Sequence, residues 1–163
     1  MATRRLSAPL VVGIVGTILA SLVVLRVWTA FERDQTIFVA FGIESTDIND
    51  YAEAKLGREV AKRAALGHDG KYFFVQANDP LLLEPGENIA VIDRPLYRSQ
   101  RMFYPILAGG GGLFSPDVIV WALLIVNLIA MGVGTWTVAH LAMEMGGSPW
   151  WGLAFALNIG FIS

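Results

Sequence analysis

Two long apolar stretches flank a polar segment, and this is the clearest pattern along the chain. Leu6 to Leu25 runs for twenty residues without Asp, Glu, Lys or Arg, and Val118 to Met143 runs for twenty-six. A helix of about 20 residues crosses the hydrocarbon core of a bilayer, so each stretch is long enough to span it. We predict transmembrane helices over residues 8–30 and 118–140.

A third apolar run begins at Pro149 and continues to Ser163, where the sequence stops. A span needs roughly 20 residues, so residues 149–163 are interpreted as the truncated start of a third transmembrane helix after a short cytoplasmic connection at 141–148. We therefore expect this chain to be the N-terminal part of a longer, multi-pass membrane protein.

The charges beside the first apolar stretch predict its orientation. Arg4 and Arg5 precede it, and Lys and Arg in short flanks mark the cytoplasmic side. Residues 1–7 are thus expected inside the cell and the 31–117 loop outside, because long loops translocate largely regardless of charge. A cleaved signal peptide is the alternative, but no clear cleavage site follows the apolar stretch, and Arg26, Trp28 and Phe31 are typical of a span's interfacial anchors.

Composition narrows the functional classes. The chain is 55% hydrophobic and only 16% charged, a balance typical of membrane proteins. Its net charge of −2 and the lack of a basic stripe exclude nucleic acid as a partner. It has no cysteine, so neither disulfides nor thiolate metal ligands are available.

The 31–117 loop carries the polar residues and is expected to fold into juxtamembrane helices. Tyr51 to Leu66 is rich in helix formers and is followed by Gly67, and Lys71 to Asn78 is predicted as a second short helix. Leu81 to Asn88 is expected to be irregular. A third helix is predicted to begin at Pro95 and run through Arg101 toward Pro105.

The third helix is predicted to be amphipathic. Arg94, Arg98 and Arg101 fall on one side of a helical wheel, and Leu96, Phe103 and Leu107 fall on the other. Such a helix can lie in the membrane interface with its guanidinium groups toward phosphate. Two readings remain open, a specific phosphate site or contact with anionic headgroups alone.

Asp69 lies in a His68-Asp69-Gly70 turn, where aspartate is common for structural reasons. From the turn alone, a structural role is the simpler reading. An acid held at a membrane surface beside cations also suits chemistry on a lipid-linked substrate, because a carboxylate can take a proton from an attacking hydroxyl.

Three short stretches resemble bacterial polytopic proteins associated with cell-surface glycopolymers. The family pattern is similar to G-Y-D-G-Q-F-Y, then D-P, then Y-R-x-Q-R-x-x-Y-P. This chain has Gly67 to Phe73, then Asp79-Pro80, then Tyr97 to Pro105, with His68 in place of tyrosine and Lys71 in place of glutamine. These proteins look like relatives of the GT-C glycosyltransferases, membrane enzymes that take sugars from polyprenyl-phosphate donors.

The resemblance implies an all-α integral membrane fold, in which the first outward loop bears an acid essential to catalysis. Carried to this chain, that acid is Asp69. The implied residues for binding substrate or lipid phosphate are Lys71, Tyr72, Arg94, Tyr97, Arg98, Gln100 and Arg101. The implied partners are membrane lipid, a polyprenyl-phosphate-linked sugar and a glycan or lipid acceptor, in the bacterial inner membrane.

The sequence identifies no cofactor. A divalent cation, if the reaction uses one, is expected to be held by Asp69. The alternative function is a non-catalytic membrane component that binds or guides polyprenyl-linked glycans during surface-polymer assembly.

Overall fold

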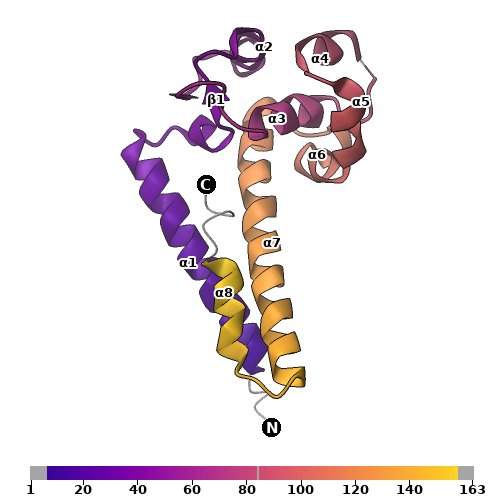
Figure 1. Ribbon diagram of the computed structural model, residues 1–163. Coiled ribbons are helices and arrows are strands. Elements are labelled where there is room, and N and C mark those ends of the chain that lie inside the picture. The colour runs from indigo at the N-terminus through magenta and orange to yellow at the C-terminus, as the bar shows by residue number, and fades with distance from the viewer. Residues whose placement is uncertain (1–6, 84, 158–163) are drawn as a thin grey trace. The chain divides into compact units, whose positions relative to one another are not determined.

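The computed structural model describes residues 7–83 and 85–157, which are mostly helical. The chain divides into two compact units, which we call the helical unit (residues up to Val27 and from Asn127 onward) and the loop domain (Trp28–Val126). The helical unit contains most of α1 (Ala8–Ala30), the C-terminal part of α7 (Pro116–Glu144), η4 (Pro149–Gly152) and α8 (Leu153–Ala156) (Figure 1). The loop domain contains η1 (Gln35–Phe38), β1 (Phe41–Gly42), α2 (Thr46–Leu56), β2 (Lys62–Arg63), α3 (Gly70–Asn78), α4 (Pro85–Val91), α5 (Pro95–Arg98), η2 (Ser99–Arg101), α6 (Phe103–Ala108) and η3 (Gly110–Gly112).

Helices α1 and α7 are long and apolar enough to cross a membrane. Only 28% of the apolar window of each is buried within the protein, so most of this surface is free to face another apolar medium. Helix α1 covers the predicted range 8–30, whereas α7 extends beyond 118–140 at both ends. The membrane boundaries and orientation stay predictions, and Arg4, Arg5 and residues 158–163 lie outside the described residues.

Within the helical unit, α1 and α7 approach closely at small residues. A methyl group added to Gly16 would come within 2.7 Å of Thr135 Cγ2, and one added to Gly132 would collide with Thr17 Oγ1. Close backbone approach at small residues is the usual way in which helices associate without a hydrophobic driving force.

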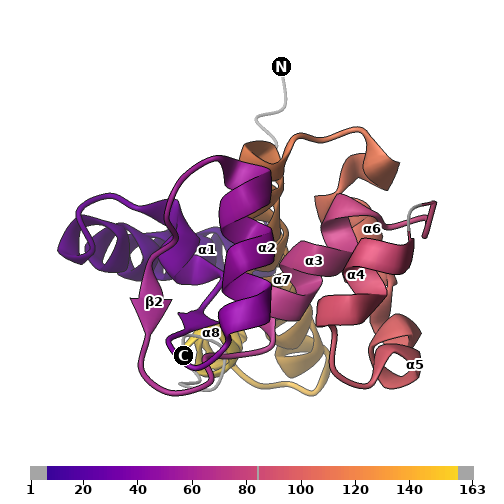
Figure 2. The same ribbon diagram turned by 90° about the horizontal axis from the view of Figure 1, so that it is seen from above.

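The loop domain has its own apolar core. Phe41 and Phe74 meet edge to face with ring centroids 5.8 Å apart, and both side chains are fully buried. Helix α3 packs against both α2 and α6 (Figure 2). The first turns of α7 complete this core with Ile119, Val120 and Leu123, and the Tyr104 hydroxyl donates to the Leu123 carbonyl over 2.8 Å. The domain is therefore built directly on the N-terminal end of α7.

The helix predicted over Tyr51 to Leu66 is wrong in its second half. Helix α2 ends at Leu56 because Gly57 adopts the left-handed conformation (φ 67°) and closes the last turn with a bond to the Glu53 carbonyl. The chain then extends, and β2 pairs in parallel with β1 over two residues each. Glu53 accordingly pairs with Lys62 (3.0 Å) across this turn.

The other predicted loop elements have mixed outcomes. The short second helix is confirmed as α3. In the segment expected to be irregular, Leu81 to Asn88, α4 begins at Pro85 and continues beyond the segment to Val91. The third helix does begin at Pro95, but it is broken into α5, η2 and α6, and Arg94 lies outside it with φ 49°. The single helical wheel that placed Arg94 beside Arg98 and Arg101 is therefore wrong for Arg94.

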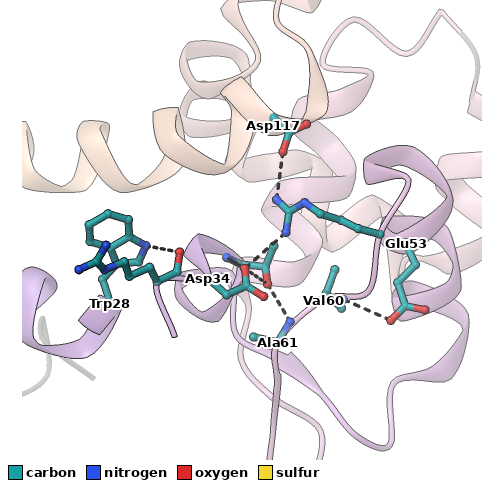
Figure 3. Close-up of polar contacts among 9 residues, drawn as sticks. Trp28, Asp34, Glu53, Val60, Ala61 and Asp117 are labelled. Atoms are coloured by element: carbon teal, nitrogen blue, oxygen red, sulfur yellow. Dashed lines mark hydrogen bonds and ion pairs between the residues drawn. The ribbon is translucent and has the colours of Figure 1, made fainter. Parts of the chain in front are cut away.

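Arg58 joins the segment that follows α1 to the first turn of α7. Figure 3 labels its two partners, Asp34 and Asp117. It contacts Asp117 Oδ1 through Nη2 (3.0 Å) and Asp34 Oδ1 through Nη1 (3.5 Å). Asp34 also accepts from the backbone and hydroxyl of Thr36, whose Oγ1 in turn accepts from Ala61 N. These contacts are local to the loop domain and partly exposed, so we assign them a structural role.

Candidate functional site

The segment before Asp69 is held in place by contacts from distant parts of the loop domain. His68 N donates to the Ala40 carbonyl over 3.0 Å, and Gly67 pairs with Phe41 in an isolated bridge. The ammonium group of Lys71 donates to Ser45 Oγ over 2.6 Å and to the Leu66 carbonyl. The turn that carries Asp69 therefore has a fixed backbone.

Asp69 immediately precedes α3, and its backbone carbonyl accepts from Tyr72 N over 3.0 Å. Its side chain makes no capping bond to the described backbone of α3. Instead, Asp69 Oδ1 lies 2.8 Å from Nη1 of Arg98. The simpler reading of the sequence gave Asp69 a structural role in its own turn. The carboxylate does not cap that turn and contacts Arg98 instead.

Arg98 is the centre of a cluster that we call the Arg98 cluster: Asp69, Tyr72, Asp93 and Arg98. Besides Asp69, the guanidinium contacts Asp93 Oδ1 through Nε at 3.0 Å, and its central carbon lies 3.9 Å from the centroid of the Tyr72 ring. The Arg98 side chain is only 12% exposed, whereas the side chains of Asp69 and Asp93 are 52% and 51% exposed. The arrangement thus places a covered cation beneath two accessible carboxylates.

The charges in the cluster reinforce one another. Burial acts to lower the pKa of Arg98, but hydrogen bonds to Asp69 and Asp93 outweigh it and raise the pKa above its ordinary value. Burial acts to raise the pKa of Asp93, and the bond to Arg98 outweighs it and lowers that pKa. The pKa of the Tyr72 phenol is raised by burial and by the negative charge of Asp93, so the phenol stays protonated.

The remaining predicted site residues divide into two groups. Lys71 is only 4% exposed, and its ammonium group donates hydrogen bonds to Ser45 and Leu66. This position favours a structural role over phosphate binding. Burial lowers the pKa of Lys71. By contrast, Arg94, Gln100 and Arg101 are exposed, and Arg101 donates to the hydroxyl of Tyr97 over 2.9 Å.

The described ranges hold no group of three or more His, Asp or Glu side chains close enough to share a metal ion. The two carboxylates at this site, Asp69 and Asp93, both contact the guanidinium of Arg98. The cation that these carboxylates meet in this structure is therefore the arginine.

Asp93 is the member of the Arg98 cluster that the sequence analysis did not single out. It lies in the Asp93-Arg94-Pro95 stretch, directly before the predicted third helix, and its position five residues before Arg98 was the available signal. The amphipathic pattern indicated that the arginines bind phosphate, whereas the structure pairs Arg98 with Asp69 and Asp93.

The Arg98–Asp93 bond predicts a pH dependence of stability. Because the pKa of Asp93 is lowered in the folded state, its stabilising contribution is present above its ordinary pKa and is lost as pH falls through the folded value. Asp93→Asn should lower the unfolding free energy near neutral pH by about 0.5–1 kcal/mol, a range that allows for solvent screening of this half-exposed side chain. The difference from wild type should shrink as the solution is acidified.

Thermal unfolding in detergent, followed by circular dichroism over a range of pH, measures this difference. Glu59→Gln is the control, since Glu59 is an exposed acid of the same domain that lies between α2 and β2, outside the first turn of any helix. A pH-independent difference for Asp93→Asn would contradict the pairing with Arg98.

Comparison with known proteins finds no matching family model, no similar curated protein and no similar solved structure.

Proposed function

We propose that this chain is the N-terminal part of a membrane glycosyltransferase that takes a sugar from a polyprenyl-phosphate donor. In this proposal α1 and α7 cross the bacterial inner membrane, and the loop domain lies on the extracytoplasmic side. Asp69 is the catalytic base, and the acceptor is a glycan or a lipid. The family resemblance of the 67–73 and 97–105 stretches motivates the reaction class.

The observation that carries the proposal is the geometry of Asp69. Its carboxylate is half exposed, is not spent on capping its own helix, and is oriented by a covered guanidinium at 2.8 Å. A fixed, accessible carboxylate is what a general base needs, because proton transfer requires the base within hydrogen-bond reach of the attacking hydroxyl.

The proposed reaction is a single displacement at the anomeric carbon. The acceptor oxygen forms a bond to that carbon while the bond to the lipid phosphate oxygen breaks, and Asp69 takes the proton of the acceptor hydroxyl. The departing phosphate carries away the bonding electron pair, so nearby cations favour the transition state. Asp69→Asn in the full-length protein tests this step, with sugar transfer as the readout.

The structure changes which arginines suit the phosphate. Arg98 already contacts two carboxylates, so we assign it to orienting Asp69. Arg101 and Arg94 are exposed and are the better candidates to meet phosphate. The alternative, a non-catalytic component that binds polyprenyl-linked glycans, would depend on these two arginines and tolerate the loss of the Asp69 charge.

The membrane placement predicts the accessibility of the loop domain. Glu59 is exposed and lies between α2 and β2, and the chain contains no cysteine, so Glu59→Cys introduces a single thiol. We expect this thiol to react with an impermeant maleimide added to intact cells or spheroplasts. The physical reason is the Arg4 and Arg5 flank, which favours a cytoplasmic N-terminus.

A cysteine introduced in the Met145 to Ser148 connection is the matched control, since it is predicted to lie on the opposite side. It should react only after lysis. The reverse pattern would contradict the proposed topology and, with it, the placement of Asp69 outside the cell.

A further inference from the structure

An apolar pocket of about 120 Å³ lies in the loop domain. Some of its lining residues are neighbours of Asp93 and Arg98 in the sequence. Helices α4 and α5 and the segments around them form it. Its main apolar lining residues are Leu82, Ile89, Ile92, Leu96 and Met102. Neither the proposed reaction nor the sequence analysis assigns this pocket a role.

The polar residues that border the pocket contribute almost none of its exposed lining, and most of their polar atoms form hydrogen bonds. Asn88 Nδ2 donates to Asp79 Oδ2 over 3.1 Å, and Asn88 Oδ1 accepts from the Tyr51 hydroxyl over 2.7 Å. Gln76 Oε1 is buried and accepts no hydrogen bond among the described residues. The wall open to a ligand is therefore almost wholly apolar, so the part of a ligand that enters must be a hydrocarbon.

The size of the pocket limits what can enter. A cavity of about 150 Å³ accepts one benzene molecule, so a slightly smaller one holds a segment of a few carbons. This suits part of a chain rather than a whole lipid. The mouth is also apolar, since Leu96 is 86% exposed and Ile89 and Leu82 are 47% and 46% exposed.

Two arginines are sequence neighbours of residues that line the pocket. Arg94 directly precedes the lining residue Pro95, and Arg101 directly precedes the lining residue Met102. Both arginines are exposed. An apolar pocket whose lining residues adjoin exposed arginines in the chain suits a hydrocarbon chain that ends in an anionic phosphate headgroup.

The position of the domain favours such an amphiphile. The loop domain includes the C-terminal end of α1 and the first turns of α7, which are the ends of both candidate membrane spans. We propose that this pocket binds a short segment of the aliphatic chain of a phosphate-bearing amphiphile, with Arg94 and Arg101 facing the phosphate. The inference deepens the proposed function, on whose membrane location it rests, by placing the chain of the lipid.

Photolabelling in nanodiscs tests the pocket directly. The probe is an alkyl phosphate with a diazirine in its chain, added in trace amounts to the chain reconstituted in zwitterionic lipid. We expect adducts on the peptides that contain the lining residues. Leu96→Trp should reduce this labelling by about tenfold or more, since each excluded methylene accounts for a factor of about four in affinity.

Leu113→Trp is the matched control, because Leu113 is 88% exposed and does not line the pocket, and it should label like wild type. Ser99→Trp provides a second obstruction at an exposed lining residue. Labelling that is unchanged in both obstructed variants would overturn the assignment. Equal labelling by the matching alkyl alcohol would overturn the role of the phosphate.

Two competition arms distinguish the sources of the chain. Displacement of the probe by unlabelled phosphatidylglycerol identifies bulk membrane lipid, and displacement by an isoprenoid phosphate alone identifies a lipid-linked substrate. Both results support the phosphate-bearing amphiphile, whereas displacement by neither overturns it. Asp69→Asn should label normally, so a failure of the pocket is separable from a failure of the catalytic proposal.

Discussion

Asp69→Asn is expected to lower the rate of sugar transfer by the full-length protein about 100-fold or more. This is the lower part of the range for removing a positioned general base. Asparagine keeps the size of the side chain and an oxygen that can accept from Arg98, so the turn and the loop domain should remain folded. The measurement is transfer of labelled sugar from a polyprenyl-phosphate donor, with membrane insertion checked in the same preparation.

Two further variants make this result interpretable. Asp47→Asn removes an exposed acid from the same domain and should transfer sugar at the wild-type rate. Asp93→Asn should have an intermediate effect of about tenfold, because Arg98 loses one of the two carboxylates that orient it but keeps its contact with Asp69. Full activity in Asp69→Asn would return Asp69 to a structural role and place the binding-protein alternative ahead.

The long helices were the most predictable part of the fold. An uncharged run of twenty or more residues leaves few alternatives to a helix in an apolar environment, and α1 begins and ends where the pattern indicated. The short α3 was also predictable, because the Asp69-Gly70 turn and the Asp79-Pro80 pair mark its two ends.

The error over residues 51–66 has a tertiary cause. Two apolar residues of this segment do reach the core, since Ala52 is fully buried and Val60 is 6% exposed. They do not share one helix, because Val60 reaches the core after the chain has turned at Gly57. Pairing of β2 with β1 involves residues about twenty positions apart, and a local pattern of helix formers contains no information about such a partner.

The candidate site was predictable in its residue types but not in its pairings. Asp69, Tyr72 and Arg98 were all singled out from the sequence, and the structure brings them together. Arg98 was predicted to bind phosphate, but its guanidinium contacts the carboxylates of Asp69 and Asp93. The burial of Lys71 was also not predictable, because its ammonium group contacts Ser45, 26 residues earlier in the chain, as well as Leu66.

Gly67→Ala is expected to destabilise the loop domain by about 3 kcal/mol or more. Gly67 has φ 69°, which costs an L residue about 1–2 kcal/mol. The added methyl group would also collide with the Ala40 carbonyl oxygen and come within 2.7 Å of Gly42 N. Both neighbours are backbone atoms next to or within β1, so they cannot move aside as a flexible side chain could.

Gly57→Ala separates the two contributions to this cost. Gly57 has nearly the same backbone angle (φ 67°), but a methyl group there would meet nothing within 4 Å. Only the strain of the left-handed backbone remains, so we expect the unfolding free energy to fall by about 1–2 kcal/mol. Thermal unfolding in detergent gives both values, and hydrogen exchange of the peptide spanning residues 40–68 reports the opening of the His68 to Ala40 bond.

The comparison also bears on the site, because Gly67 lies two residues before Asp69 and fixes the turn that carries it. Gly67→Ala should lose sugar transfer together with the protection of His68 N, whereas Asp69→Asn should lose transfer with that protection intact. Gly57→Ala should retain both. Equal destabilisation by the two glycine variants would show that the 40–42 and 65–67 segments are not closely packed, and the turn would then not hold the Asp69 carboxylate in a fixed position for proton transfer.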